Sequence, residues 1–165
     1  MNIQFATTNK GTTIVELIIY MLFLSVFFII LTNIFVTSLE TRLEAETTSA
    51  VSIDGRFILT RLMYDIERSE AIISPALGSS DSTMAIVLSG VDNTYQLQGG
   101  NLVIINNNGT NQLNSVNTRL TNLTFKRIGN SGGKNTIRVN FTIESVTVVK
   151  HGPRVQNFTM TVSTR

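Results

Sequence analysis

The sequence predicts an α+β protein in which a long N-terminal helix packs on a C-terminal antiparallel β-sheet domain. Two observations predict this fold. Residues 17–39 contain no charged side chain, which is typical of a helix that crosses a membrane. Beyond Pro75, apolar and polar residues alternate along several segments, which is typical of half-buried strands. A length of 165 residues is enough for one globular domain and one additional element.

The first element is the apolar run. As a helix, residues 17–39 would be roughly 35 Å long at ~1.5 Å per residue, enough to cross a bilayer core of ~30 Å. Lys10 precedes the run, and Glu40 and Glu44 follow it. The positive-inside rule therefore predicts a cytoplasmic N-terminus and a C-terminal domain on the outer side. A cleaved secretory signal is the rival interpretation, but its apolar region is usually only ~7–15 residues long.

Glu16 lies at the beginning of this run, and an ordinary membrane anchor does not explain it. A charged residue at the centre of a membrane helix costs ~2.5–3.5 kcal/mol on insertion scales and usually has a partner. At the membrane edge the cost is smaller, and it becomes large only if the helix moves into a dry assembly. A carboxylate that simply reaches water at the membrane edge is the alternative.

The helical pattern is predicted to continue through residues 40–74, where it becomes amphipathic. Apolar residues recur there at steps of three and four, so we expect them to share one face while charged residues occupy the others. Arg61 and Asp65 have the spacing of an i,i+4 ion pair. Pro75 ends the helix at about Ile73, because proline disfavours helical geometry at the preceding residue. The expected face contains Leu39, Leu43, Ala50, Ile53, Phe57, Leu62, Ile66 and Ile73.

Residues 75–165 are predicted to form an antiparallel sheet. Gly99 and Gly100 interrupt an alternating pattern and favour a hairpin turn. The apolar face of such a sheet needs a cover, and the helical residues 43–73 are the obvious one. We expect strands within residues 85–88, 94–105, 120–128, 137–144 and 158–163, and turns or loops at 106–110 and 129–134.

The residue content argues against catalysis. The chain has no cysteine and a single histidine, His151, so a thiolate or transition-metal centre is disfavoured. Asp81, Asp92 and Glu144 are scattered, and no nucleophile is paired with a base. The Asn- and Asp-containing loops offer oxygen ligands for Ca²⁺, but without EF-hand spacing. We therefore expect no enzyme activity, no catalytic residue, no cofactor and no metal site, and we expect His151 in an exposed turn.

Charge is distributed unevenly along the chain. Residues 37–74 carry four basic and seven acidic side chains, whereas residues 75–165 carry eight basic and three acidic ones. Complementary packing or solubility explains this difference, and a basic end that contacts DNA or an acidic partner is a weaker alternative. Basic residues on strands also protect sheet edges. We interpret the Asn-x-Thr triplets as a product of composition; they begin at Asn108, Asn122, Asn140 and Asn157.

The stretch KGTTIVELIIYMLFL resembles the class III signal of type IV pilins and of type II secretion pseudopilins. In that family a short basic leader ends in glycine, and a glutamate follows five positions later at the start of a long apolar helix. The match lies at Gly11, Thr13, Ile14, Val15, Glu16 and Leu17.

The resemblance implies a division of the chain and a set of roles. Residues 1–11 would be a prepilin leader, and a membrane-embedded prepilin peptidase would cut after Gly11. Thr12 would become the new N-terminus, which the same enzyme commonly N-methylates. Residues 12–39 would be the transmembrane and filament-core helix, 40–74 its amphipathic continuation, and 75–165 the sheet domain. Glu16 would pair with the N-terminal ammonium of a neighbouring subunit during assembly.

A weaker resemblance covers the middle of the chain. Residues 55–72, GRFILTRLMYDIERSEAI, are similar to the segment that follows the long helix in J-type minor pseudopilins and W-type minor pilins. Residues 120–128 are similar to a strand of the same proteins. Three features depart from the family: Thr12 replaces the usual phenylalanine, Asn33 replaces a frequent proline, and the C-terminal cysteine pair is absent.

The resemblance implies a minor pilin or pseudopilin, a tip or priming subunit of a type IV pilus or a type II secretion pseudopilus. It would reside in the bacterial inner membrane and then in the filament. Its partners would be other pilin subunits, the prepilin peptidase, the inner-membrane assembly platform and, before assembly, lipid. The sequence does not choose among protein secretion, motility or adhesion, and DNA uptake. The second hypothesis is a single-pass anchored domain that binds a ligand outside the cytoplasm.

Overall fold

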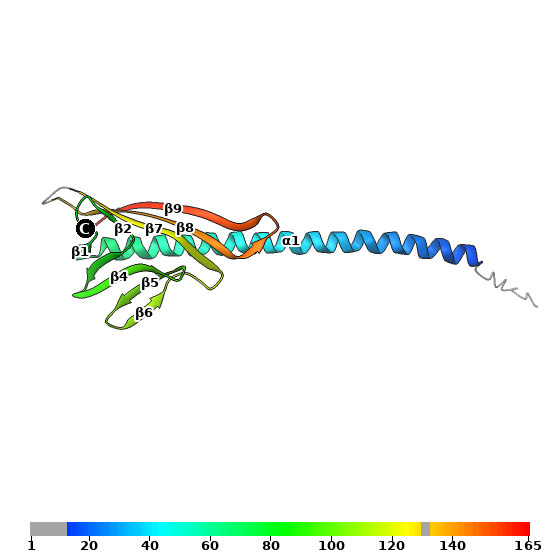
Figure 1. Ribbon diagram of the computed structural model, residues 1–165, viewed down its shortest axis with the longest axis horizontal. Coiled ribbons are helices and arrows are strands. Elements are labelled where there is room, and N and C mark those ends of the chain that lie inside the picture. The colour runs from blue at the N-terminus through cyan, green and yellow to red at the C-terminus, as the bar shows by residue number, and fades with distance from the viewer. Residues whose placement is uncertain (1–12, 130–132) are drawn as a thin grey trace, which may run out of the picture. The chain divides into compact units, whose positions relative to one another are not determined.

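A computed structural model describes residues 13–129 and 133–165. These residues form one helix, α1 (Ile14–Glu67), and nine strands, which Figure 1 labels. The chain divides into two compact units, Met1–Thr41 and Arg42–Arg165. Helix α1 belongs to both units, and the strands belong to the second. The predicted α+β class, a long N-terminal helix with a C-terminal antiparallel sheet domain, is confirmed.

In the first unit, residues 14–41 are helical and apolar on every side. An 18-residue window of α1 is apolar enough to cross a membrane, and no residue in that window is buried. Three hydroxyl groups are satisfied within the helix, because Ser25, Thr32 and Thr37 each donate to the carbonyl four residues earlier. These three side chains therefore present no free hydroxyl donor to an apolar surrounding.

The second unit contains two antiparallel sheets. The first has the order β1-β3-β4-β5-β6, with β1 at Ala71–Ser74, β3 at Met84–Leu88, β4 at Val91–Gln98, β5 at Asn101–Asn106 and β6 at Gly109–Gln112. The predicted hairpin is confirmed, because Gln98 pairs with Asn101 across Gly99 and Gly100. Both glycines have a positive φ, which a two-residue hairpin turn of this kind requires.

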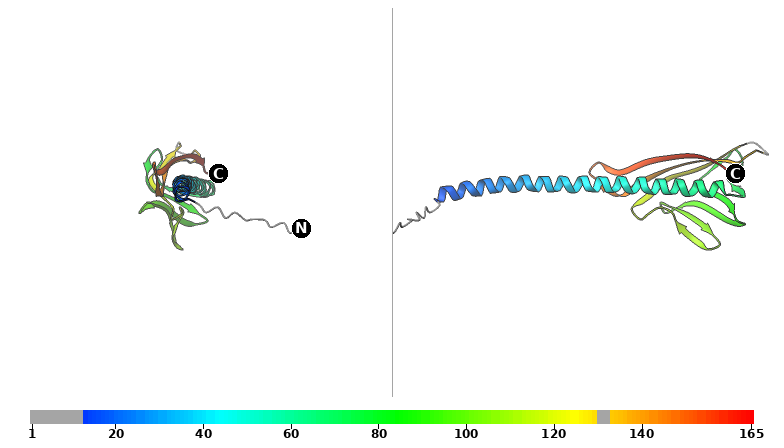
Figure 2. Two further views of the ribbon diagram at one scale, coloured as in Figure 1. Left: turned by 90° about the vertical axis from the view of Figure 1, so that its right-hand side faces the viewer. Right: turned by 180° about the vertical axis from the view of Figure 1, so that it is seen from behind.

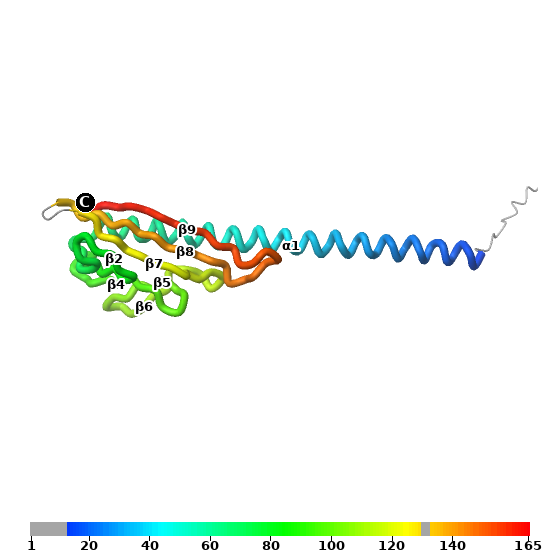
Figure 3. The backbone as a smooth tube through the Cα atoms, turned by 45° about the horizontal axis from the view of Figure 1, so that its top comes forward, coloured from blue at the N-terminus to red at the C-terminus, as the bar shows by residue number. Residues whose placement is uncertain are grey.

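The second sheet has the order β2-β7-β8-β9, with β2 at Ser80–Asp81, β7 at Thr118–Ile128, β8 at Thr136–Val149 and β9 at Gly152–Ser163. Figure 3 shows β7, β8 and β9 side by side, as their continuous registers require. The sequence predicted the strands in β7, β8 and β9 but not their full lengths. It also did not predict that the strands would separate into two sheets.

The C-terminal part of α1 lies between these two sheets, as both views in Figure 2 show. The helix buries Val51, Ile58, Leu62 and Ile66 completely. They meet Ile86, Tyr95, Phe125, Val139, Phe141 and Ile143 of the strands in one core cluster. The C-terminal part of α1 thus covers the apolar faces of the sheets, as predicted.

The predicted composition of the buried helix face is wrong in part. Ile53 and Phe57 are exposed, and so are Leu43 and Ile73, although Leu62 and Ile66 are buried as expected. Phe57 precedes the buried Ile58 by one residue, which turns it about 100° around the helix. Apolar residues occupy two faces of this segment, and the spacing rule alone merged them into one.

The predicted end of the helix is also wrong. Helix α1 ends at Glu67, and residues 71–74 form strand β1 instead of a last helical turn. Ser69 donates its hydroxyl to the carbonyl of Ile66 at the helix end. Ile72 then pairs with Ile86 of β3, where its β-branched side chain is buried in the core.

Candidate functional site at the start of the long helix

Thr13 begins the described chain and caps helix α1. Its Oγ1 accepts a hydrogen bond from the backbone N–H of Glu16 at 3.3 Å. An N-cap threonine satisfies one of the otherwise unpaired N–H groups of the first turn. The signal for this cap was present as Thr-x-x-Glu, residues 13–16, which is the pattern of a capping box. The sequence interpretation used Thr13 only as part of the signal motif and missed the cap.

The carboxylate of Glu16 has a partner within its own helix. The hydroxyl of Tyr20 donates to Glu16 Oε1 at 2.9 Å, one helical turn further along. Tyr20 was not singled out from the sequence, although it is the only tyrosine in the apolar run. An ionised carboxylate offers about four acceptor positions. One hydroxyl therefore leaves Glu16 able to accept further hydrogen bonds, including those of an ammonium group.

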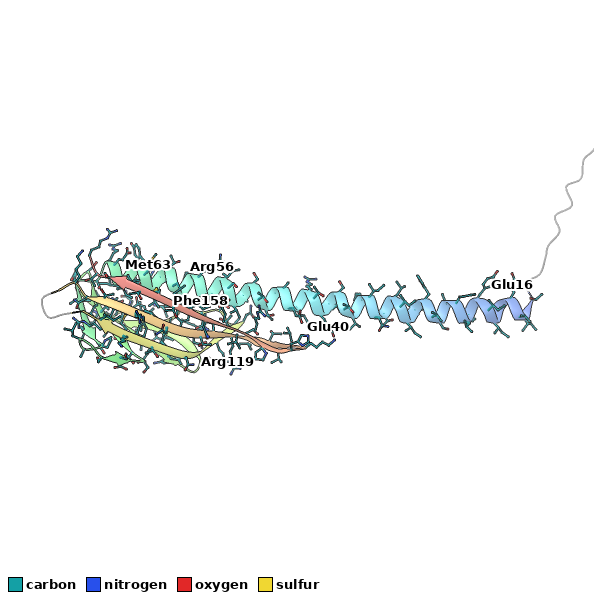
Figure 4. The ribbon with its side chains drawn as sticks, turned by 90° about the horizontal axis from the view of Figure 1, so that it is seen from above. Glu16, Glu40, Arg56, Met63, Arg119 and Phe158 are labelled. Carbon is teal, nitrogen blue, oxygen red and sulfur yellow. The ribbon has the colours of Figure 1, made fainter. Side chains whose placement is uncertain are left out.

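The surroundings of this carboxylate are apolar. From Leu17 onward, the large side chains of the first unit are exposed on all sides of the helix, Phe23 and Phe35 among the most exposed. A helix that is apolar all round is typical of a membrane span or of the interior of a large assembly. Figure 4 shows Glu16 near the beginning of this helix. Chemically, the Glu16 carboxylate can bind a cation at the N-terminal end of this apolar helix.

Gly11 and Thr12 lie outside the described residues. The predicted cleavage after Gly11 and methylation of Thr12 therefore stay predictions. The same holds for the pairing of Glu16 with a neighbouring N-terminus, because the structure contains one chain.

The acidic residues of the second unit have structural partners. Asp65 is buried, accepts a hydrogen bond from the Tyr95 hydroxyl at 2.6 Å, and pairs with Arg61 at 2.7 Å. Burial raises the pKa of Tyr95 far above its ordinary value of 10.0, and the Asp65 carboxylate raises it further. The tyrosine hydroxyl is thus kept as a hydrogen-bond donor. The predicted Arg61–Asp65 pair is confirmed, and the burial of Asp65 is what the sequence did not reveal.

Asp54 connects α1 to the start of β7 and to the segment before it. Its Oδ2 accepts from the backbone N–H of Ser115 at 2.9 Å, from the Ser115 hydroxyl at 2.7 Å, and from the Thr118 hydroxyl. Asp54 and Ser115 are far apart in the sequence, so no local pattern could have identified this contact.

The other acidic candidates lie apart from one another. Glu144 pairs with Arg119 at 3.4 Å, and Asp81 accepts from the backbone of Thr83 at 3.2 Å. Asp92 is exposed on β4, and His151 is exposed in the turn between β8 and β9, as predicted. Among residues 13–129 and 133–165, no three His, Cys, Asp or Glu side chains gather as they would around a metal ion.

The basic residues of the second half are divided among different environments. Arg127 donates to the carbonyls of Ile72 and Pro75 and to Asn135, so it joins β1 and two loop residues to β7. Arg119 is paired with Glu144 (Figure 4). Lys126 and Arg138 are cross-strand neighbours on β7 and β8 and are exposed.

Three of the four Asn-x-Thr triplets lie together on the outer face of the second sheet. In register, Asn122 lies opposite Thr142 and Thr142 opposite Asn157, while Thr124 lies opposite Asn140 and Asn140 opposite Thr159. Thr142 donates its hydroxyl to Asn157 at 2.8 Å. The side chains surround a shallow polar recess. The sequence showed the triplets but not their juxtaposition, which depends on strand register.

Comparisons with known proteins do not extend this description: no family model, no curated protein and no solved structure matches the chain.

Proposed function

We propose that this chain is a minor pilin or pseudopilin, a structural tip or priming subunit of a type IV pilus or a type II secretion pseudopilus. One observation carries the proposal: a carboxylate, Glu16, sits at the beginning of a helix whose apolar side chains are exposed all round. The position of Glu16 five residues after Gly11 supports it. The proposed subunit has no enzymatic activity.

In the proposed cycle, the chain first resides in the bacterial inner membrane, with residues 42–165 outside the cytoplasm. Lys10 before the apolar run and Glu44 after it support this orientation. Prepilin peptidase removes residues 1–11 on the cytoplasmic side, and Thr12 becomes a methylated N-terminus. The assembly platform then moves the helix from lipid into the filament.

Glu16 directs assembly in this proposal. Lipid tails are already apolar, so transfer of the helix into a bundle gains little from the hydrophobic effect, and packing and polar contacts must decide register. The Glu16 carboxylate accepts a hydrogen bond from the N-terminal ammonium of a neighbouring subunit. The Tyr20 hydroxyl keeps its own hydrogen bond to Glu16 Oε1. Removing one partner of a buried ion pair costs ~3–5 kcal/mol, so a subunit in the wrong register is disfavoured.

A Glu16→Leu variant tests this role. We expect the variant to be processed after Gly11 and to remain in the membrane, but to be missing from sheared filaments or pseudopili. Glu16→Gln separates charge from shape, because it keeps the side-chain shape and the Tyr20 contact but lacks the charge. If the charge directs assembly, Glu16→Gln should also be missing from the filaments. Normal incorporation of Glu16→Leu would contradict the proposal.

The recess on the outer face of β7, β8 and β9 favours a second candidate, a single-pass anchored domain that binds a polar ligand. The amide and hydroxyl groups around it both donate and accept hydrogen bonds. Glu16→Leu separates the two candidates, since a solitary anchored receptor should keep its ligand binding and its function.

A further inference from the structure

A cavity of about 200 Å³ lies where residues 44–48 of α1 meet the turn between β8 and β9. In Figure 3 this turn lies beside α1, at the end of the second unit farthest from the C-terminus. The helix contributes Glu44, Thr47 and Thr48, and the hairpin contributes His151 and Arg154. Pockets for drug-sized ligands measure about 300–1,000 Å³, so this cavity suits a smaller polar group. We call it the hairpin cavity.

Two opposite charges line the hairpin cavity from different elements. Glu44 is half-buried on α1, and Arg154 is exposed on β9. Within residues 13–129 and 133–165, neither of these two side chains makes a hydrogen bond or an ion pair. Lys150, the other cation of the turn, has an interaction of its own. A negative and a positive group thus line one cavity without pairing, which suits a ligand that carries both charges.

The hairpin cavity lies near the level at which α1 would leave a membrane. Glu44 is five positions after Leu39, the last residue of the uncharged run, and is therefore about 7.5 Å further along the helix. Side chains on a helix lean toward its N-terminus, so the Glu44 carboxylate leans back toward that run. Headgroups widen a hydrocarbon core of ~30 Å to ~40–45 Å, which gives them about 5–8 Å on each side. The cavity therefore lies at the outer edge of the headgroup layer.

We propose that the hairpin cavity binds the headgroup of phosphatidylethanolamine, a lipid that carries a phosphate and a primary ammonium. The guanidinium of Arg154 donates paired hydrogen bonds to the phosphate oxygens. The Glu44 carboxylate accepts a hydrogen bond from the ammonium, which has three donors. Val148 is 69% exposed in the same hairpin and offers an apolar side chain to the rest of the lipid.

The two charges select this headgroup among the common ones. Phosphatidylglycerol has the phosphate but no ammonium, so it would leave Glu44 unpaired beside an anion. Phosphatidylcholine has a quaternary ammonium, which has no N–H to donate and is bulkier. Binding of this kind requires only that α1 crosses a membrane, which both candidate functions share. It does not require cleavage after Gly11 or assembly into a filament.

Native mass spectrometry of the full-length chain tests the site, because it counts the lipids bound to each protein molecule. The chain is kept in detergent and titrated with phosphatidylethanolamine, phosphatidylglycerol or phosphatidylcholine of identical acyl chains. We expect the wild type to bind phosphatidylethanolamine about fivefold better than phosphatidylcholine, the ratio that one net hydrogen bond supplies.

Two substitutions divide the headgroup between its two charges. Glu44→Lys should reverse the preference for phosphatidylethanolamine over phosphatidylglycerol, because it places a cation where the ammonium binds. Glu46→Lys is the matched control, since Glu46 makes the same charge change two positions later and lines a different cavity. Arg154→Gln should weaken the binding of both lipids several-fold. Arg138→Gln, on the outer face of β8, is its control and should keep the wild-type ratio.

Equal binding of the three lipids by the wild type, or the same change from Glu44→Lys and Glu46→Lys, would overturn the proposed site. Free phosphoethanolamine distinguishes a lipid from a soluble ligand. If it displaces phosphatidylethanolamine at equal concentration, the ligand is soluble and the lipid assignment is wrong. None of these readings depends on the mature N-terminus or on filament incorporation, so failure of the lipid site would leave the proposed function standing.

Discussion

Residues 14–41 and residues 42–67 belong to one helix, yet their apolar side chains are distributed differently around it. The first part is apolar on every side, and none of its side chains is buried. The second part has a buried face built around Ile58 and Leu62 and an exposed face that carries Phe57. The first part thus leaves its apolar side chains exposed, whereas the second part is supported by the two sheets.

This difference separates assembly from stability. A change at Glu16 should alter assembly without altering the fold of residues 42–165, because the hydrogen bonds of Glu16 are to Thr13 and Tyr20 at the start of the helix. A change on the buried face of residues 42–67 should do the opposite. The following substitutions probe the second part, in order of expected effect.

The largest effect is expected from Ile58, compared with its neighbour Phe57. Ile58→Ala should destabilise the second unit by about 2–5 kcal/mol, because it leaves a cavity among completely buried side chains. Phe57→Ala should change stability by no more than about 0.5 kcal/mol, as an exposed position does. Denaturant unfolding of the full chain in detergent, followed by near-ultraviolet circular dichroism, measures both. Equal costs would show that the two faces have been assigned wrongly.

Gly55 should show a smaller effect. A Cβ at this position would overlap the ring of Phe158, which is stacked on Phe141 with ring centroids 5.3 Å apart. We expect Gly55→Ala to cost about 1–3 kcal/mol by overpacking, offset by up to ~1 kcal/mol from the higher helix propensity of alanine. Ser49→Ala on the exposed face is the control, and it should be neutral or slightly stabilising. A stabilised Gly55→Ala chain would show that the helix is not held against β9.

Tyr95 gives an effect of similar size to that of Gly55, together with a pH signature. Tyr95→Phe removes the hydrogen bond to Asp65 and should cost about 1–3 kcal/mol at neutral pH. The raised pKa of Tyr95 means that the unfolded chain loses this proton first as pH rises past 10.0. The wild type should therefore lose stability above that pH by up to about 1.4 kcal/mol per pH unit from this group. Unfolding titrations between pH 8 and 11 should show a shallower decline for Tyr95→Phe; identical slopes would contradict the assignment.

The sequence predicted the elements better than their contacts. The apolar run, the hairpin at Gly99 and the strands after residue 118 follow from periodicity, which is a local property. The choice between the two apolar faces of α1 depends on which one meets the sheets, and periodicity cannot supply that. The partners of Asp54 and Asp65 are Ser115 and Tyr95, which come from distant segments.

At the candidate site, local residue spacings predict two contacts of Glu16 that the sequence interpretation did not include. Thr13 as a helix cap and Tyr20 as the partner of Glu16 both follow from spacings of three and four residues. Residues 71–74 were predicted as helix because no proline precedes Pro75. Their isoleucines instead pair in β1, where tertiary contacts override a weak helical preference.

The mass of the mature N-terminus tests the central proposal most directly. The chain is extracted from membranes of cells that have an active prepilin peptidase, and its N-terminal peptide is measured by mass spectrometry. The account predicts that the wild-type chain begins at Thr12 and that Gly11→Val keeps the leader. A wild-type chain that still begins at Met1 under these conditions would contradict the filament proposal and favour a solitary anchored domain.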